Sequence, residues 1–492
     1  MRRSATALHT ETNPSLKKVI LMRLERLALI LTFSSLLLTA TASAGTYYVA
    51  TNGNDTTGTG TITNPFASIY TAVRNGTVYS DLTAGNPVTI YVRGGIYYSR
   101  TSVWIDGTAN GRLTIQAYPG EYPILDGSQL AAGEDVVTIG SAYTDFIGFE
   151  IRNAPHVGYV GWGQTYGKVL NCIIHDSQGD GIWIGEDTPG VAHDMVVAGN
   201  TVYRNCLSNS ARNAPNGGWP QAIGISAHNT VVRNNRVFRN YGEGIIIGEV
   251  DNCSVIGNEV FDNFSNNIYL EHSRYTIVDG NLCYAFDSNY YRNYNTTGGS
   301  NWQPAMGVVL ANEHPDVATT HTLANNTIIN NVIIHAYWGI GYWRDDQGLS
   351  NIKFANNTIY DPTGAALHID YDTTATGVIV ENNIFALPSG STASMTGAYD
   401  LAKVSTTTLQ STGFTFRYNL WSSAPSAPAH TTTSNDQIGS PGFVLAGGHN
   451  AEDYKLTSTS LAKDHGVTLS YVTIDYTRKP RSGTYDIGAH EY

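Results

Sequence analysis

The chain has 492 residues, of which 41% are hydrophobic and 14% charged, and its formal net charge is −12. This acidic balance argues against a nucleic-acid-binding protein, because binding to phosphates requires a basic surface. The length is ample for a large hydrophobic core, and no polar linker marks a second domain.

Residues 1–44 have the pattern of a secretory signal peptide. An apolar run at residues 27–38 follows Arg23 and Arg26 and precedes Ala42-Ser43-Ala44. The run is too short to span a membrane, and small residues precede the expected cleavage site. Cleavage after Ala44 would remove six of the 28 basic and two of the 40 acidic side chains and leave a net charge of −16. We expect an exported monomer, secreted or periplasmic, with no membrane span.

Residues 45–130 are expected to form an N-terminal cap and the first coils of a repeat. Apolar residues recur at helical spacing across Phe66–Val73. Strands are predicted at Val88–Val92 and Leu113–Ala117, which are rich in β-branched residues. A helix placed before a series of strands can cover the open edge of the first one.

Residues 131–387 contain a repeated asparagine that precedes a short apolar pair. The interval is 23 residues from Asn235 to Asn258 and again from Asn258 to Asn281. The full series is Asn171, Asn200, Asn235, Asn258, Asn281, Asn331, Asn357 and Asn383. Such an interval predicts a solenoid, whose units bury their apolar faces only by stacking. Asparagine suits the tight turns because it tolerates the left-handed conformation, and stacked amides can bond each other.

A second set of apolar runs keeps step with the asparagines. The runs are Ile182–Ile184, Ile223–Ile225, Ile245–Ile247, Ile268–Leu270, Val308–Leu310, Ile340–Tyr342 and Leu367–Ile369. In each strand the first and third residues should face inward and the middle one outward. Because the repeated asparagines and the apolar runs recur together along the chain, they predict an all-β fold, a parallel β-helix. Residues 388–492 should form late coils and an irregular cap, with Phe414–Asn419 as the last clear strand and asparagine.

Four cysteines, Cys172, Cys206, Cys253 and Cys283, all lie in the repeat region. An exported protein can form disulfides, but no pair has the spacing of a metal site. We interpret them as buried thiols that pack as small hydrophobic residues.

Several segments resemble the pectin-lyase-like superfamily of secreted right-handed β-helix proteins. Thr46–Asp55, Pro65–Ile69, Tyr91–Tyr98 and Tyr118–Gly127 resemble the opening of those proteins, and Asp486–Tyr492 is similar to their closing segment. The resemblance implies a right-handed helix with a helical N-terminal cap. It does not imply one activity, because the superfamily includes lyases, hydrolases, epimerases and tailspikes.

Acidic, histidine and aromatic residues are expected to gather at the end of one sheet, the one formed by the second set of runs. Turn residues of any solenoid are polar, so an isolated Glu or His there is usually only solvated. Two long insertions, residues 207–220 and 285–304, flank this sheet, and long loops beside a rigid scaffold are usually functional. Trp and Tyr side chains can stack on sugar rings. The pattern therefore predicts a polysaccharide or oligosaccharide as the partner.

Hydrolysis by paired carboxylates is the favoured chemistry. Glycosidases hold two carboxyl groups about 5–9.5 Å apart, and neighbouring coils are about 4.8 Å apart. We expect Glu249 and Glu271 to form the acid/base pair, with Glu313 and Asp345 as a second candidate pair. The expected substrate-binding residues are Trp183, Trp219, His228, Tyr269, His272, Trp302, Trp343 and Arg344. His314 is expected in the same site.

Two alternatives stay open. The first is a polysaccharide lyase or epimerase acting on a uronate, in which the acids could bind Ca²⁺ and His272 could act as the base. The aligned strands lack the lysine that the pectate-lyase pattern would provide, which lowers this alternative. The second is a noncatalytic protein that binds glycans or has a surface role.

Overall fold

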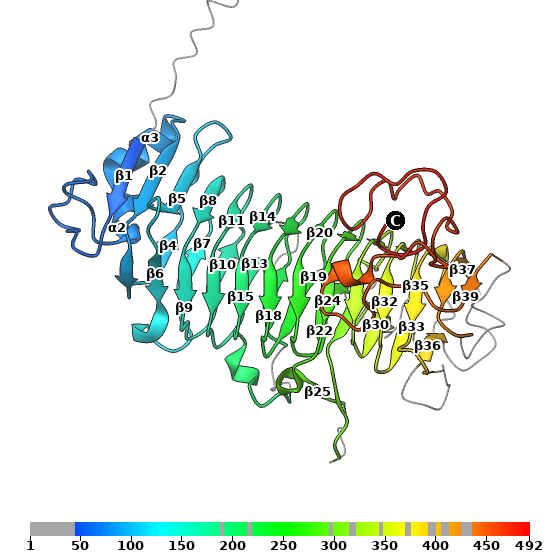
Figure 1. Cartoon of the computed structure of the whole chain (residues 1–492). Helices are drawn as coiled ribbons and strands as arrows, with labels where there is room; N and C mark the ends of the chain where they lie inside the picture. The colour runs from blue at the N-terminus through cyan, green and yellow to red at the C-terminus, as the bar shows by residue number, and fades with distance from the viewer. Residues whose placement is uncertain are drawn as a thin grey trace, which may run out of the picture. The chain divides into compact units, whose positions relative to one another are not determined.

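The computed structural model describes residues 45–186, 191–213, 219–294, 299–313, 321–343, 348–369, 375–391, 400–404, 413–424 and 435–492. Within Gly45–Tyr492, parallel strands stack coil upon coil in three sheets (Figure 1). This arrangement confirms the predicted right-handed parallel β-helix. In the part of the chain that is described, no helix is long and apolar enough to cross a membrane. The expected signal peptide lies outside the described residues and stays a prediction.

The first sheet has thirteen strands. They are β1 (Gly45–Val49), β2 (Val88–Val92), β5 (Leu113–Ala117), β8 (Thr144–Ile147), β11 (Lys168–Leu170), β14 (Val196–Ala198), β17 (Val231–Arg233), β20 (Ser254–Ile256), β23 (Ile277–Asp279), β28 (Thr327–Ile329), β31 (Lys353–Ala355), β34 (Val378–Glu381) and β37 (Phe414–Arg417). The strands predicted at Val88–Val92 and Leu113–Ala117 are confirmed as β2 and β5.

The second sheet, which we call the face sheet, has eleven strands and contains the second set of runs. They are β4 (Thr101–Val103), β7 (Val137–Ile139), β10 (Tyr159–Trp162), β13 (Ile182–Gly185), β16 (Gln221–Ile225), β19 (Glu243–Gly248), β22 (Asn266–Glu271), β27 (Met306–Ala311), β30 (Trp338–Trp343), β33 (Ala365–Ile369) and β36 (Asp400–Val404).

The third sheet follows the asparagine turns and has thirteen strands. They are β3 (Gly95–Tyr97), β6 (Pro123–Asp126), β9 (Glu150–Arg152), β12 (Ile173–His175), β15 (Thr201–Tyr203), β18 (Arg236–Phe238), β21 (Glu259–Phe261), β24 (Leu282–Tyr284), β29 (Val332–Ile334), β32 (Thr358–Tyr360), β35 (Ile384–Ala386), β38 (Leu420–Trp421) and β39 (Gln437–Ile438).

The face sheet has the predicted register. Ile245, Ile246 and Ile247 of β19 pair with Ile268, Tyr269 and Leu270 of β22. The first and third residue of each run are fully buried in the core between the sheets. Burying an aliphatic side chain of this size contributes roughly 1.5–3 kcal/mol, so this repeated core is the main stabilising element.

The predicted asparagine stack is present at the turn between the first and third sheets. Nδ2 of Asn258 donates to Oδ1 of Asn281 at 2.9 Å, and Oδ1 of Asn258 accepts from the backbone N–H of Asn235, also at 2.9 Å. The same bonds join Asn200, Asn235, Asn258, Asn281, Asn331, Asn357, Asn383 and Asn419. Each buried amide therefore satisfies the backbone of the next turn.

Asn171 belongs to the repeated series but does not join this stack. Cys172 takes its place, because the backbone N–H of Cys172 donates to Oδ1 of Asn200 at 2.9 Å. Asn171 instead adopts the left-handed conformation at φ 54°. All four cysteines are free and buried, as predicted. Burial raises the pKa of the Cys172 thiol to about 11, so this thiol is unreactive.

The helical N-terminal cap is also confirmed. Helix α2 (Ile69–Arg74) begins after Ser68, whose side chain accepts a hydrogen bond from the backbone N–H of Thr71. Its Ile69, Ala72 and Val73 side chains are buried, and α3 (Gly76–Thr83) follows directly. These helices lie at the start of the stack beside β1 and β2, where they cover the first coil (Figure 1).

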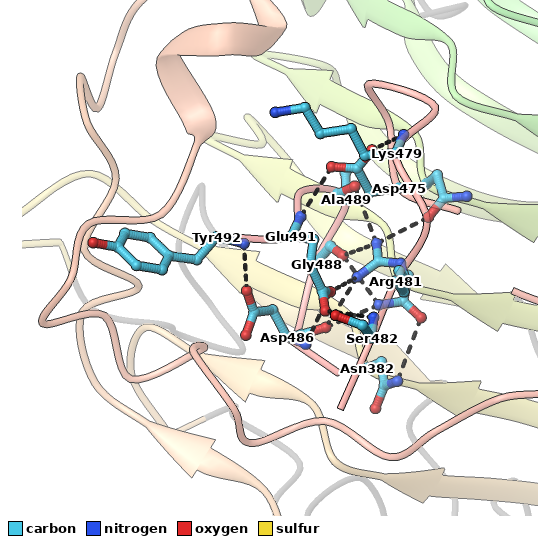
Figure 2. Close-up of polar contacts among 12 residues, drawn as sticks. Asn382, Asp475, Lys479, Arg481, Ser482, Asp486, Gly488, Ala489, Glu491 and Tyr492 are labelled. Atoms are coloured by element: carbon cyan, nitrogen blue, oxygen red, sulfur yellow. Dashed lines mark hydrogen bonds and ion pairs between the residues drawn. The ribbon is translucent and has the colours of Figure 1, made fainter. Parts of the chain in front are cut away.

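The C-terminal segment folds back along the coils, which the sequence pattern did not predict. Arg481 is fully buried, and its Nη1 lies 2.9 Å from Oε2 of Glu491 (Figure 2). Its Nη2 donates to Oδ1 of Asn330 at 3.0 Å. Nδ2 of Asn356 donates to the carbonyl of Asp486 at 3.0 Å, so the segment is bonded to more than one coil.

Candidate active site

The two insertions beside the face sheet contact one another. Nη1 of Arg212 in the first insertion donates to the carbonyl of Ser288 in the second at 2.8 Å, and its guanidinium lies 4.3 Å from the ring centroid of Trp302. The guanidinium of Arg292, in the second insertion, lies 4.5 Å from the ring centroid of Trp219 in the first. The described parts of the insertions are therefore held together by two arginines that stack on tryptophans.

The second insertion also packs onto the outer surface of the face sheet. It includes the antiparallel pair β25 (Arg292–Asn293) and β26 (Trp302–Gln303). Tyr294 packs against an apolar cluster on this surface that includes Tyr269, Met306 and Trp338. The insertion thus shields the middle of the face sheet from solvent.

Three glutamates converge on the Tyr269 side chain. Burial raises the pKa of Tyr269 well above its usual range, and the charges of Glu271, Glu313 and Glu243 raise it further. Glu243 is the first residue of β19, Glu271 is the last of β22, and Glu313 is two residues beyond β27. We call Glu243, Glu271 and Glu313 the glutamate cluster.

Glu243 is the most perturbed acid of the glutamate cluster. It is 5% exposed, and desolvation raises its pKa to about 8, with Glu313 and Glu271 adding to the shift. The hydrogen bond from Asn266 and the positive charge of Arg292 oppose the shift without reversing it. Glu243 is therefore protonated at neutral pH, as a general acid requires.

Glu249 and Glu271 lie on neighbouring coils, offset by one residue along the strand as expected, and their role as an acid/base pair stays a prediction. Gly248 is the residue in register with Glu271, and Glu249 follows it in the left-handed conformation at φ 59°. The backbone N–H of Glu249 donates to the carbonyl of Glu271 at 2.9 Å. Glu249 thus begins the turn, whereas Glu271 contributes to the charge around Tyr269.

The sequence analysis missed Glu243 because the strict alternation of inward-facing and outward-facing side chains along the strand fails at Gly244. A Cβ on Gly244 would lie 2.6 Å from Cγ1 of Val260, so Gly244 faces the core, as does Ile245 beside it. Two consecutive inward residues put Glu243 on the outer surface, whereas counting back from Ile245 would put it inside. The glycines on both sides of Glu243 were the available signal.

The two predicted histidines, His228 and His272, each take part in a hydrogen bond within the turns, and their role in substrate binding stays a prediction. His272 is fully buried, and its Nδ1 lies 3.1 Å from the carbonyl of His321. His228 accepts a hydrogen bond of 3.0 Å at Nδ1 from the backbone N–H of Asp251. The His228 side chain is partly exposed, whereas that of His272 is buried.

The predicted aromatic residues lie on both sides of the glutamate cluster. Trp183 of β13 contacts Trp162 of β10 with ring centroids 5.6 Å apart. Trp343 of β30 contacts Trp338 at 5.5 Å. Trp219 and Trp302 are partly exposed on the insertions. Arg344, Asp345 and His314 lie outside the described residues, so their predicted roles stay predictions.

Among the described residues, no group of three His, Cys, Asp or Glu side chains is arranged to hold a metal ion. Lys403 of β36 lies outside the aligned strands and is in register with His368 of β33.

The chain matches a protein family over residues 47–301, described as the Pel9A-like, right handed beta helix region. It belongs to this family. The match covers the N-terminal cap and the coils as far as the second insertion. The glutamate cluster thus lies partly within it, because Glu313 is beyond its end.

One relative in sequence is pectate lyase PEL9 of Emericella nidulans. It is 34% identical over 131 residues, which cover 24% of this chain and 30% of the relative, so the chain spans less than a third of that protein. Pectate lyase Pel9A is similar in structure, with a TM-score of 0.52 and 17% identity over 92% of this chain and 98% of that chain. A complex of XylC with xylose has a TM-score of 0.57 and 13% identity over 91% and 98%. The structural matches show the fold alone, and the lyase names lend no support to a preference for hydrolysis.

Proposed function

We propose that this protein is an exported enzyme that cleaves a polysaccharide or oligosaccharide at the glutamate cluster. One observation carries the proposal: Glu243 is buried near Glu271 and Glu313, with a neutral amide, Asn266, bonded to its carboxyl group, and this burial raises its pKa to about 8. A protonated acid next to ionised carboxylates is the combination that glycosidic bond cleavage uses. The similarity to proteins named pectate lyase supports a glycan as the substrate.

Hydrolysis is the chemistry that these side chains support. Glu243 donates its proton to the glycosidic oxygen as the bond to the anomeric carbon breaks. Glu271 accepts a proton from the water molecule whose oxygen bonds to that carbon, or it attacks the carbon itself. Tyr269 and Asn266 hold the acids in place. If Glu271 takes the proton of the water molecule, the new reducing end forms in one step, and exchange with solvent returns a proton to Glu243. If Glu271 attacks the carbon, water then hydrolyses the resulting ester, and Glu243 recovers its proton from that water as the reducing end and the Glu271 carboxylate are released.

Elimination is a second candidate, because the chain is similar to proteins named pectate lyase. A lyase removes the proton beside a uronate carboxylate and leaves an unsaturated product. Arg292 could bind the uronate carboxylate, since its guanidinium lies close enough to lower the pKa of Glu243. An epimerase would remove the same proton and return it on the other face of the sugar.

The two reactions differ in their products. The purified protein should be incubated with neutral and uronate-containing polysaccharides, and reducing ends and ultraviolet absorbance should be followed together. Hydrolysis releases reducing ends without the absorbance of an unsaturated uronate, whereas elimination produces both. If the absorbance rises in proportion to the new reducing ends, the reaction is elimination and the proposal of hydrolysis is wrong. If neither reducing ends nor absorbance appear with any polysaccharide of the panel, the noncatalytic glycan-binding function would remain.

A further inference from the structure

A separate cavity lies on the face sheet, on the N-terminal side of the glutamate cluster. It has a volume of about 660 Å³ and is lined by Trp162, Trp183 and Trp219 together with Asp135 and Asp180. This volume is within the range of roughly 300–1,000 Å³ that is typical of small-molecule sites. We call it the tryptophan cavity. Nothing in the proposed reaction uses its two aspartates.

The aromatic walls suit the flat apolar face of a sugar ring. Trp162 of β10 is 37% exposed, and its ring is tilted by 45° against that of Trp183. Trp219 reaches the same cavity from the first insertion and is also 37% exposed. Partly exposed indoles that line a cavity offer area for stacking and N–H groups for hydrogen bonds. Their exposure is unusual for side chains of this size beside a core.

The polar groups of the tryptophan cavity accept hydrogen bonds. Oδ1 of Asp135 lies 2.8 Å from Nδ1 of His156, and Oδ1 of Asp180 accepts from the backbone N–H of Gln221 at 2.7 Å. Burial raises the pKa of Asp180 to about 7, so this carboxyl is uncharged in part at neutral pH. The remaining oxygen positions can accept hydrogen bonds from sugar hydroxyls.

The charge of the tryptophan cavity disfavours an acidic sugar. The residues that line it include two aspartates and one histidine, His156, which is paired with Asp135, and neither lysine nor arginine. The Arg292 guanidinium approaches Trp219, yet Arg292 does not line the cavity. A uronate placed here would bring its carboxylate next to Asp135 without a guanidinium to pair with it, which is unfavourable in a partly desolvated site.

We propose that the tryptophan cavity binds a sugar residue that has no carboxylate, as a recognition subsite for the glycan. The inference rests on the proposed function, because it takes this sugar to belong to the chain cleaved at the glutamate cluster. Trp183 and Tyr269 occupy the same column of the face sheet, three coils apart through Gly224 and Ile246. With steps of about 4.8 Å, the coil of Glu243 lies about 10 Å and that of Glu271 about 14 Å from the coil of Trp183, so the substrate spans several sugar units.

The test is binding, measured apart from cleavage. The Glu243→Gln variant should be titrated by calorimetry at neutral pH with cellohexaose, xylohexaose, β-1,4-galactohexaose and hexagalacturonate. At least one neutral hexasaccharide should bind, and it should bind more tightly than hexagalacturonate. Trp183→Ala in the same background should weaken that binding about tenfold or more, the effect of removing an aromatic anchor. Trp183→Phe keeps a flat ring and should retain most of the affinity.

Trp104→Ala is the matched control, because Trp104 is 56% exposed and lies outside the tryptophan cavity. It should leave the affinity unchanged, and thermal melting should show that every variant is folded. Three results would overturn the inference: no neutral probe binds, hexagalacturonate binds more tightly than all of them, or folded Trp183→Ala binds as before. Failure of the proposed function looks different, since binding at the cavity would then persist while the wild-type protein cleaves nothing.

Discussion

Nδ2 of Asn266 donates a hydrogen bond of 2.6 Å to Oε1 of Glu243 on the preceding coil, although the two residues are 23 positions apart in the chain. The pairing follows from the coil length, because one turn of the helix brings residues at this interval side by side. The bond is made by a neutral amide, which cannot compensate a buried negative charge as an arginine would. Glu243 therefore keeps its proton.

Glu243→Gln should abolish turnover while the protein stays folded. Glutamine keeps the acceptor for Asn266 but cannot deliver a proton, so kcat should fall by about 100-fold or more, the scale of general acid catalysis. Glu271→Gln should have an effect of the same size. Steady-state kinetics on an active substrate, with KM determined separately, measures both changes.

The control for these variants is Glu452→Gln, an exposed residue of the C-terminal segment, which should behave like the wild-type protein. The wild-type rate should also fall above a pH of about 8, where Glu243 loses its proton. Normal turnover in both Glu243→Gln and Glu271→Gln would contradict the assignment and direct attention to Glu313 and Asp345.

Stability should fall as the pH rises toward 8. Burial raises the pKa of Glu243 from 4.5 to about 8 and that of Asp180 from 3.8 to about 7. At pH values between the unfolded and the folded pKa of each group, the folded state binds more protons than the unfolded state. The free energy of unfolding therefore decreases as the pH rises from about 4 to about 8. Thermal melting at a series of pH values should show the slope, and Glu243→Gln combined with Asp180→Asn should flatten it. An unchanged slope in the double variant would mean that other groups dominate.

Asn258→Ala should destabilise the helix more than any exposed asparagine substitution. Asn258 donates to Asn281 and to the carbonyl of Val232, and it accepts two hydrogen bonds from Asn235. Removing the amide leaves buried partners unsatisfied, at a cost of roughly 2–4 kcal/mol. Chemical denaturation measures the loss. Asn52→Ala, at an exposed turn, should cost almost nothing, and equal effects in the two variants would refute a stabilising role of the stack.

Arg481→Met should release the C-terminal segment from the coils. The change leaves Glu491 and the carbonyls of Gly488 and Ala489 without their buried partner, which typically costs about 3 kcal/mol or more. Limited proteolysis should cut the segment faster than in wild-type protein. Lys479→Met, an exposed neighbour, is the control, and equal protection of both variants would show that the buried guanidinium is dispensable.

Export should leave Gly45 as the first residue. Ala42 and Ala44 precede this position after an apolar run, which is the pattern that signal peptidase recognises. Mass spectrometry of the exported protein measures the new terminus. Recovery of an intact leader on protein from the cytoplasm would contradict the prediction.

The register of the solenoid could be predicted because it depends on the spacing of the asparagines and of the apolar triplets along the chain. The 23-residue interval from Asn235 to Asn258 and the apolar triplets each satisfy one coil, and identical coils stack in only one way that buries every triplet. The position of Glu271 on the outer surface followed from the same count. Asn331 of the predicted series is confirmed in the stack, because Nδ2 of Asn281 donates to its Oδ1.

The chain's own sequence therefore determined the solenoid, its N-terminal helical cap and the surface on which the acids gather, since period and polarity act within one coil and its neighbours. Only the tertiary structure decided which acids meet. Gly244 turns inward against Val260 and reverses the side on which Glu243 lies. Arg292, from an insertion, reaches Trp219 in another insertion, and Arg481 bonds to Asn330 across 151 positions. Such contacts depend on three-dimensional packing between distant segments, for which the repeat contains no periodic signal.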